Sequence, residues 1–333
     1  MRFKKQSVLP SWIFVCFGIG LLFWSPNMML AQQDPGLSMF QLNAMNQNPA
    51  NAGLRGASFA QLHYRNQWTQ YEASVEGPGN LGTQLLSVSL PFSKLNFGVG
   101  VLVMSDKTPS GVGQQSMKIQ LAYHYTLGEA ILSLGLRGGL HGKSFDGRAY
   151  RIRDENDPIA SQLSGKVISQ NQFDLGLGLL YSKDNWQIGL SADHLTSPKF
   201  TMDTPQGNMP VNMVAALHGT AEIVLSESLA AMPFAQVRYY SGKVLPELGT
   251  RFGYKDLFWL GGSFRLNDAA IGMAGVSLLQ QKLDIGYSLD VAMVQAAVKA
   301  PLTHEIFVRF QLPSFQSNGI KGLPVRTPRF KIL

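Results

Sequence analysis

The chain has 333 residues and a formal net charge of +7 at pH 7, and only 15% of its residues are charged. Typical soluble domains have about 25% charged residues, so the composition is unusual for a soluble protein of this length. Part of the positive charge lies in the N-terminal segment and in the C-terminal stretch KGLPVRTPRFK. The N-terminal segment predicts export, as described next, and an exported chain does not meet a genome, so we expect no nucleic-acid partner.

Residues 1–31 are predicted to be a cleavable signal peptide. A basic start, MRFKK, is followed by the apolar run WIFVCFGIGLLFW (12–24) and by the small residue Ala31 before the expected cleavage point. A membrane-spanning helix needs roughly 20 apolar residues, so this run is too short to be an anchor. Cys16 is the only cysteine. We therefore expect a mature chain without a disulfide or a thiolate metal site.

Residues 32–56 contain the turn-forming stretch QNPANAG (47–53). Pro49 restricts φ, and Gly53 permits a left-handed or closely packed position. We expect a periplasmic N-terminal segment whose turn leads the chain into its first strand. A small plug or docking surface is the functional alternative that these residues leave open.

Residues 57–312 show a sequence period of two. In SMKIQLAYHYTL (116–127), Met117 and Ile119 lie on one face and Lys118 and Gln120 on the other. Such alternation is typical of strands with one apolar and one polar face. It recurs in about fourteen segments, which begin near residues 57, 83, 95, 117, 131, 172, 186, 212, 232, 246, 257, 270, 282 and 303.

Loop lengths separate a membrane barrel from a soluble β-sandwich, which would also alternate. Tight turns are expected at 93–94, 128–130, 183–185, 226–230, 255–256 and 280–281, and long connections at 67–82, 106–116, 142–171, 195–211 and 292–302. The tight turns fall at one end of a meander, as in outer-membrane barrels with short periplasmic turns and an even strand number. We therefore predict an all-β fold, an up-and-down antiparallel transmembrane β-barrel of about 14 strands with periplasmic N- and C-termini. Residues 313–333 follow as a basic, proline-containing periplasmic tail.

The alternation also assigns faces. Leu132, Leu134 and Leu136 are expected to face lipid, and Arg137 to face the lumen. The aromatic residues near strand ends suggest an interfacial girdle. They are Trp68, Tyr71, Trp186, Tyr254 and Trp259.

Several stretches resemble the PorP/SprF family of the type IX secretion system. The stretch DPGLSMFQLNAMNQNPANAG (34–53), followed by HYRNQW (63–68), is similar to the family's N-terminal signature. SADHLTSPKF (191–200) resembles its H-L-x-x-P segment, and LDIGYSLD and THEIFVRFQL (283–290 and 303–312) resemble its last two strands. The motif residues, which are also candidate partner contacts, are Asp34, Pro35, Asn48, Pro49, Ala50, Gly53, Tyr64, Arg65, Gln67, Trp68, His194, His304 and Glu305.

The resemblance implies a non-enzymatic outer-membrane barrel, exported through its cleaved signal peptide. Its role would be to assist export or cell-surface attachment of proteins with a C-terminal secretion signal, including gliding adhesins. It implies three kinds of partner: outer-membrane lipid, periplasmic and lipoprotein secretion-system components, and a secreted client or surface adhesin. The residues by themselves leave a passive channel or small-molecule transporter as the alternative.

No residue set in the sequence indicates catalysis, a cofactor or a metal. His304 and Glu305 are adjacent on a strand and therefore point to opposite faces. The acidic residues of 154–157 resemble a calcium loop only loosely, because the glycine and distal glutamate are missing. Asp193 and His194 do not predict a catalytic triad, because the chain contains no nucleophilic serine motif of the form G-x-S-x-G. We expect no catalytic, cofactor-binding or metal site.

Overall fold

The computed structural model describes residues 34–69, 81–108, 111–149, 165–201, 209–293 and 302–313. The predicted signal peptide, the acidic stretch 154–157 and the tail beyond Pro313 lie outside these ranges. Among the described residues, no helix is both long and apolar enough to cross a membrane.

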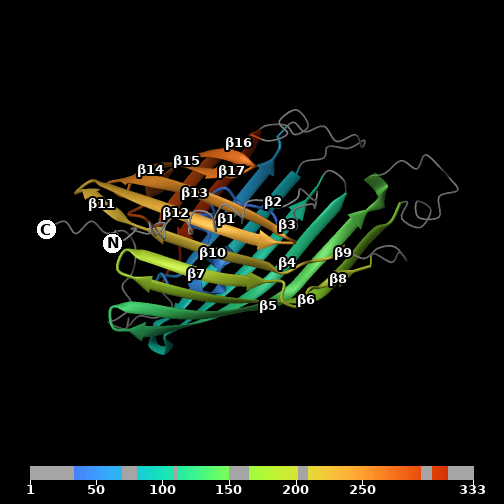
Figure 1. Ribbon diagram of the computed structural model, residues 1–333, viewed down its shortest axis with the longest axis horizontal. Coiled ribbons are helices and arrows are strands. Elements are labelled where there is room, and N and C mark those ends of the chain that lie inside the picture. Colours follow the sequence, from blue (N-terminus) through green and yellow to red (C-terminus); the bar gives the residue numbers. More distant parts are fainter. Residues whose placement is uncertain are drawn as a thin grey trace, which may run out of the picture.

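The chain forms a closed, antiparallel, 14-stranded barrel (Figure 1). Chain neighbours pair along the wall, and β1 pairs with β17 to close it. Glu222 separates β10 from β11, and both pair with β12, so together they count as one strand. The strands are β1 (Phe59–Gln67), β2 (Leu81–Phe92), β3 (Phe97–Lys107), β4 (Val112–Leu127), β5 (Ala130–Asp146), β6 (Val167–Lys183), β7 (Trp186–Asp193), β10 (Val214–Ala221), β11 (Ile223–Ser226), β12 (Leu229–Tyr240), β13 (Lys243–Tyr254), β14 (Phe258–Arg265), β15 (Ala269–Leu278), β16 (Leu283–Ala292) and β17 (Leu302–Gln311). The predicted fold and strand number are confirmed.

The two ends of the barrel differ in their connections. The short-turn end carries the connections 93–96, 128–129, 184–185, 227–228, 255–257 and 279–282. The long-loop end carries the long connections 68–80, 147–166, 194–213 and 293–301, together with the short connections 108–111, 241–242 and 266–268. A separate ribbon of β8 (Lys199–Phe200) and β9 (Met209–Pro210) lies within one long connection. Both the start of β1 and the end of β17 lie at the short-turn end.

Three strands are longer than the period of two predicted. β4, β5 and β6 have 16, 17 and 17 residues, and they occupy much of the expected loops 106–116 and 142–171. A tilted span across the bilayer needs only about 9–11 residues. The outer parts of these strands carry polar residues such as Gln115 and Lys143. They therefore lack the apolar period that marks the lipid-facing part.

The apolar face of the barrel wall points outward and the polar face inward. On β4, Met117 and Tyr125 are 57% and 54% exposed, whereas Gln120 and His124 are fully buried. On β5, Leu134 is exposed and Arg137 is buried, as predicted. This pattern is the reverse of that in a soluble sandwich and is typical of a barrel surrounded by lipid.

Residues 34–57 lie inside the barrel, and we call them the plug (Figure 1, blue). The plug contains the short helical turns η1 (Phe40–Leu42), α2 (Ala44–Gln47) and η2 (Pro49–Asn51). One apolar cluster joins it to the β12–β17 side of the wall through Met39, Phe40, Leu42, Phe234, Trp259, Ala269, Ile271, Met273 and Phe307. A second joins it to β2–β4 through Leu37, Met45, Ala52, Leu85, Leu102 and Ala122. The hydrophobic core is thus the interface between plug and wall.

Trp259 is not part of the predicted aromatic girdle. Its side chain is 9% exposed and belongs to the plug-side core. A Cβ atom on Gly286 would lie 2.7 Å from its ring, so the missing side chain there leaves room for the indole. The residues on either side of Trp259 in β14 point outward instead. The side chains of Trp186 and Tyr254 are also exposed. Tyr71 lies outside the described residues.

Candidate functional site in the barrel lumen

Asn48 connects the NPANAG turn to the wall. Its side-chain oxygen accepts a hydrogen bond from the Ala50 N–H at 2.9 Å and so caps η2. Its amide nitrogen donates to the backbone carbonyls of Leu179 on β6 and Leu190 on β7, at 3.0 and 3.1 Å. Because Asn48 is fully buried, these bonds have no competition from bulk water. Pro49 follows at the first position of η2, where a missing N–H costs nothing.

Glycines of the barrel wall leave room for the NPANAG turn. A Cβ atom on Gly135 would overlap the backbone nitrogen of Ala50, and one on Gly178 would overlap the side-chain oxygen of Asn48. Gly53 itself has φ +71°, a conformation that other residues rarely adopt, and its N–H donates to Ser89 Oγ at 3.0 Å. The turn lies directly on the backbone of β5 and β6.

A buried acidic pair holds the start of the plug against β16 and β17. Glu305 accepts hydrogen bonds from the backbone N–H groups of Ser38 and Met39, at 2.7 and 3.2 Å. Asp290 accepts from Ser38 Oγ at 2.7 Å and pairs with Arg65 at 2.9 Å. These side chains are at most 5% exposed, so each charged group is buried together with the group that pairs with it. Removing one member of such a network leaves an uncompensated buried charge.

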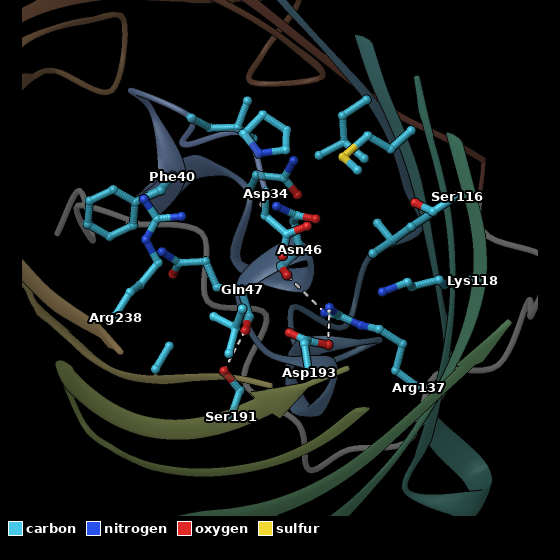
Figure 2. A pocket seen from close by; sticks show the side chains of 18 of the residues that line it. Asp34, Phe40, Asn46, Gln47, Ser116, Lys118, Arg137, Ser191, Asp193 and Arg238 are labelled. Atoms are coloured by element: carbon cyan, nitrogen blue, oxygen red, sulfur yellow. Dashed lines mark hydrogen bonds and ion pairs between the residues drawn. The ribbon is translucent and has the colours of Figure 1, made fainter. Parts of the chain in front are cut away.

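Arginines of the wall pair with the plug's backbone carbonyls. Arg137 donates to the carbonyls of Met45 and Asn46, at 2.6 and 2.9 Å, and pairs with Asp193 at 2.8 Å (Figure 2). Arg309 donates to the Leu42 carbonyl at 2.6 Å. Short helical turns leave their terminal carbonyls without internal partners. The cationic lumen supplies those partners.

A cavity of about 90 Å³ lies beside Arg137, between plug and wall (Figure 2). Asp34 and Pro35 line it from the plug, and Lys118 and Asp193 line it from the wall. A second cavity of about 660 Å³ lies toward the short-turn end and is lined by Leu54, Arg55 and the 184–185 turn, among others.

Asp34, the first described residue, connects the start of the plug to the long-loop side of the lumen. Its carboxylate lies 2.9 Å from His194 Nε2, and His194 Nδ1 lies 2.8 Å from Asp174 on β6. Lys118 reaches the same Asp174 oxygen at 2.7 Å. Burial opposes the charged imidazole, but the charge of Asp34 and the contact with Asp174 outweigh it and raise the pKa of His194 to about 9. Burial likewise opposes the charged form of Asp34, but His194 holds the pKa of Asp34 well below its usual value.

The lumen brings together most of the predicted motif residues. Asp34, Asn48, Pro49, Ala50, Gly53, Arg65, His194 and Glu305 all contribute to the plug or to its contacts, and Pro35 lines the smaller cavity. Tyr64 is 39% exposed on the outer face, while Gln67 and Trp68 lie at the end of β1. His304 meets the Tyr287 hydroxyl at 2.6 Å on the outer side, opposite to Glu305, as predicted from their adjacency. As contacts for another protein, these residues remain a prediction.

Several lumen residues that contact the plug or one another are not among the predicted motif residues. They include Ser38, His141, Asp174, Arg265 and Asp290. A signal for them existed, because each of the strand residues among them is a polar or charged residue on the inward face of its strand. What could not be seen was which of them would meet, since their partners lie on distant strands or on the plug.

A family model described as "Type IX secretion system membrane protein PorP/SprF" matches residues 29–310. No curated protein matches the chain.

Solved structures with similar folds include three outer-membrane barrels. Acinetobacter baumannii outer membrane protein Omp33 is 9% identical, covering 77% of this chain and 98% of that chain with a TM-score of 0.44. A Pseudomonas aeruginosa FadL homologue is 10% identical over 79% and 92%, with a TM-score of 0.45. The translocator domain of autotransporter NalP from Neisseria meningitidis is 12% identical over 82% and 96%, with a TM-score of 0.41. At these scores we infer nothing from them about this chain's activity.

Proposed function

We propose that this chain, which belongs to the PorP/SprF family of type IX secretion system membrane proteins, acts as a plugged anchor rather than as a conduit. The family and the barrel fold place the chain in the outer membrane. In this proposal, it assists export or cell-surface attachment of proteins with a C-terminal secretion signal, with gliding adhesins among the candidate clients. It does so without catalysis, by holding partners at the membrane.

The plug is the observation that carries the proposal. Residues 37–52 include many fully buried side chains, and both faces of the plug pack against the wall. Expelling the plug to pass a solute would separate Glu305 and Asp290 from the backbone and side chain of Ser38. Breaking one buried charged contact typically costs about 3–5 kcal/mol. This cost counts against the alternative of a passive channel or small-molecule transporter.

The short-turn end is the proposed contact for other components. There the Leu312 N–H donates to the Ser58 carbonyl at 2.9 Å, so the end of the plug, where it enters β1, lies beside the residue that follows β17. Arg55 and Leu54 also line the larger cavity at this end. In the proposed orientation this end faces the periplasm, where periplasmic and lipoprotein components of the secretion system are accessible.

Affinity purification from native outer membranes tests the proposal. The tagged chain and an unrelated tagged outer-membrane barrel would be purified in parallel, and co-purifying proteins would be quantified by mass spectrometry. We expect secretion-system components or a large surface protein to be enriched with this chain alone. A barrel that is recovered without partners and conducts ions as an open pore in planar bilayers would instead support the channel alternative.

A further inference from the structure

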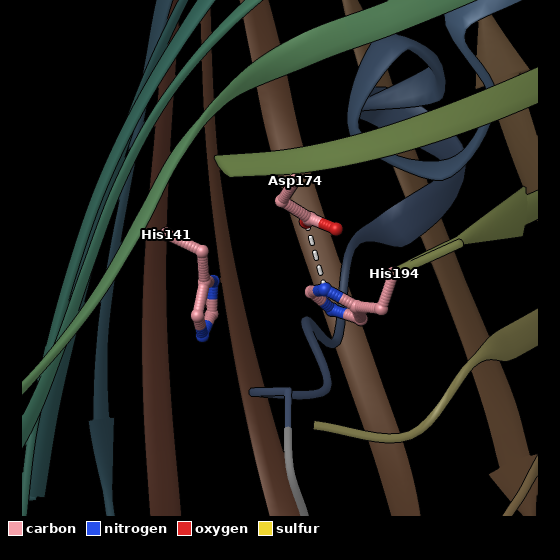
Figure 3. Close-up of side chains that lie close together, drawn as sticks. All are labelled: His141, Asp174 and His194. Atoms are coloured by element: carbon pink, nitrogen blue, oxygen red, sulfur yellow. Dashed lines mark ion pairs between the residues drawn. The ribbon is translucent and has the colours of Figure 1, made fainter. Parts of the chain in front are cut away.

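The geometry points to a divalent transition-metal site in the lumen, formed by His141, Asp174 and His194, which we propose binds Zn²⁺ or an ion of similar chemistry (Figure 3). His141 comes from β5, Asp174 from β6 and His194 from the residue after β7. Two imidazoles and one carboxylate are a ligand set that suits Zn²⁺.

The three side chains are close enough to share one ion. Their ligand atoms all lie within 4.8 Å of one another, and the residues are 1%, 0% and 1% exposed. Ligand atoms around a tetrahedral Zn²⁺ lie about 3.4 Å apart, given metal–ligand distances of about 2.0–2.1 Å. Side-chain shifts of roughly 1 Å would therefore reach that geometry, without movement of the strands.

Asp34 prepares His194 as a ligand. Its carboxylate lies 2.9 Å from Nε2 and accepts the proton on that nitrogen. His194 Nδ1 faces the Asp174 carboxylate at 2.8 Å. In the charged ring a proton lies between these two atoms, and a bound ion would take its place. Two acceptors at this distance repel unless a proton or a cation lies between them. A carboxylate that accepts the other ring N–H of a histidine ligand is also common at metal sites, where it fixes the orientation of the ring.

His141 supplies an independent indication. Its Nε2 is buried and has no hydrogen-bond partner among the residues that the structure describes. Its ring lies 5.1 Å from that of His194, and Phe200 covers it at 5.9 Å. Buried imidazole nitrogens are normally paired. Coordination of an ion shared with His194 would satisfy this one.

Lys118 is the group that opposes the ion. Its ammonium lies 2.7 Å from the Asp174 oxygen that also faces His194. The ion competes with Lys118 for this carboxylate, and it competes with a proton for His194 Nδ1. Both effects weaken binding, and removal of Lys118 should strengthen it. A bound ion would fix His194 and, through Nε2, the Asp34 end of the plug.

Titration of the full mature chain, folded in detergent, with Co²⁺ tests this site. We expect one equivalent to bind with the intense visible bands of tetrahedral Co²⁺, and Zn²⁺ to displace it. His141→Gln should weaken binding by at least about tenfold, and Asp34→Asn should weaken it by roughly 10–100-fold, the usual effect of losing a carboxylate that orients a histidine ligand. The matched control is His218→Gln, which removes a buried lumen histidine on β10 whose Nδ1 also has no partner among the described residues.

Lys118→Met keeps the test decisive if His141→Gln does not fold, because this variant should bind Co²⁺ more tightly than the wild type. Folding of each variant is checked by heat-modified migration on gels. A wild type that binds no stoichiometric Co²⁺ or Zn²⁺ would overturn the proposal. Equal binding by His141→Gln and His218→Gln would also overturn it, and so would unchanged or weaker binding by folded Lys118→Met.

Discussion

Gly178 and Asn48 approach so closely that a Cβ atom on Gly178 would overlap the side-chain oxygen of Asn48. The wall strand β6 and the plug therefore touch through backbone and a capping side chain, with no room for a methyl group. This close approach makes the position of the plug sensitive to single atoms on the wall.

Gly178→Ala should destabilise the barrel by about 1–3 kcal/mol, the usual range for overpacking a close-packed interior. The NPANAG turn would have to move off β6 or the strand would have to bend. Gly272→Ala on β15 is the matched control, because a Cβ atom there meets nothing within 4 Å. The midpoint of heat-modified migration and the bilayer conductance of both variants measure the effect. Equal behaviour of the two would contradict the packing of the turn on β6.

Glu305→Gln should lower the free energy of unfolding by about 3–5 kcal/mol, because it removes one of the two buried carboxylates that pair with Arg65 and the charge that accepts from the Ser38 and Met39 N–H groups. Glu129→Gln is the exposed counterpart, since Glu129 is 81% exposed and lies 3.8 Å from Lys183. It should change stability very little. Urea unfolding in lipid, followed by tryptophan fluorescence, compares them. A small effect at Glu305 would argue against its role in holding the plug.

Leu134→Arg should cost roughly 2–4 kcal/mol if residue 134 lies near the bilayer midplane. The side chain is 56% exposed on β5, so the arginine would enter lipid. Leu95→Arg in the short turn η3 (Ser93–Leu95), where Leu95 is 69% exposed, should be nearly neutral. Heat-modified migration separates the two variants. The assignment of the lipid face fails if both tolerate arginine equally.

A peptide tag inserted near Ser161 should be labelled on intact cells, and one inserted at Asp184 should not. The reason is that the connection 147–166 is at the long-loop end and 184–185 is at the short-turn end. In outer-membrane barrels the longer loops face outward. Labelling of permeabilised cells is the control for exposure of the second tag. The reverse pattern on intact cells would overturn the proposed orientation.

Truncation after Leu312 should leave a folded, heat-resistant barrel but reduce client display and partner recovery. The last strand ends at Gln311, and residues 313–333 contain three prolines and four basic residues with no acidic one. Proline cannot donate to a strand ladder, so this tail is not expected to add a strand. Its charge suits an acidic partner surface. A truncated chain that keeps its client and partners would exclude the docking role.

The barrel could be predicted from local patterns in the sequence. Neighbouring residues on a strand face opposite sides, so a period of two assigns Leu134 to lipid and Arg137 to the lumen without knowledge of the rest of the chain. The lengths of the connections then gave the meander and its fourteen strands. These are local properties, and local patterns suffice to predict them. Long polar extensions of β5 and β6 were missed because no regular alternation of apolar residues marks them.

The tertiary structure decided what fills the lumen. Asp34 meets His194 across 160 residues, and Ser38 meets Glu305 across 267. No period or spacing predicts such pairs, because they exist only after β1 and β17 close the wall around the plug. Trp259 shows the same limit: its aromatic character suggested a lipid interface, whereas its place on the inward face of β14 turned it toward the plug. Closure of the sheet creates the interior, and only then do the buried polar groups come within hydrogen-bonding distance of their partners.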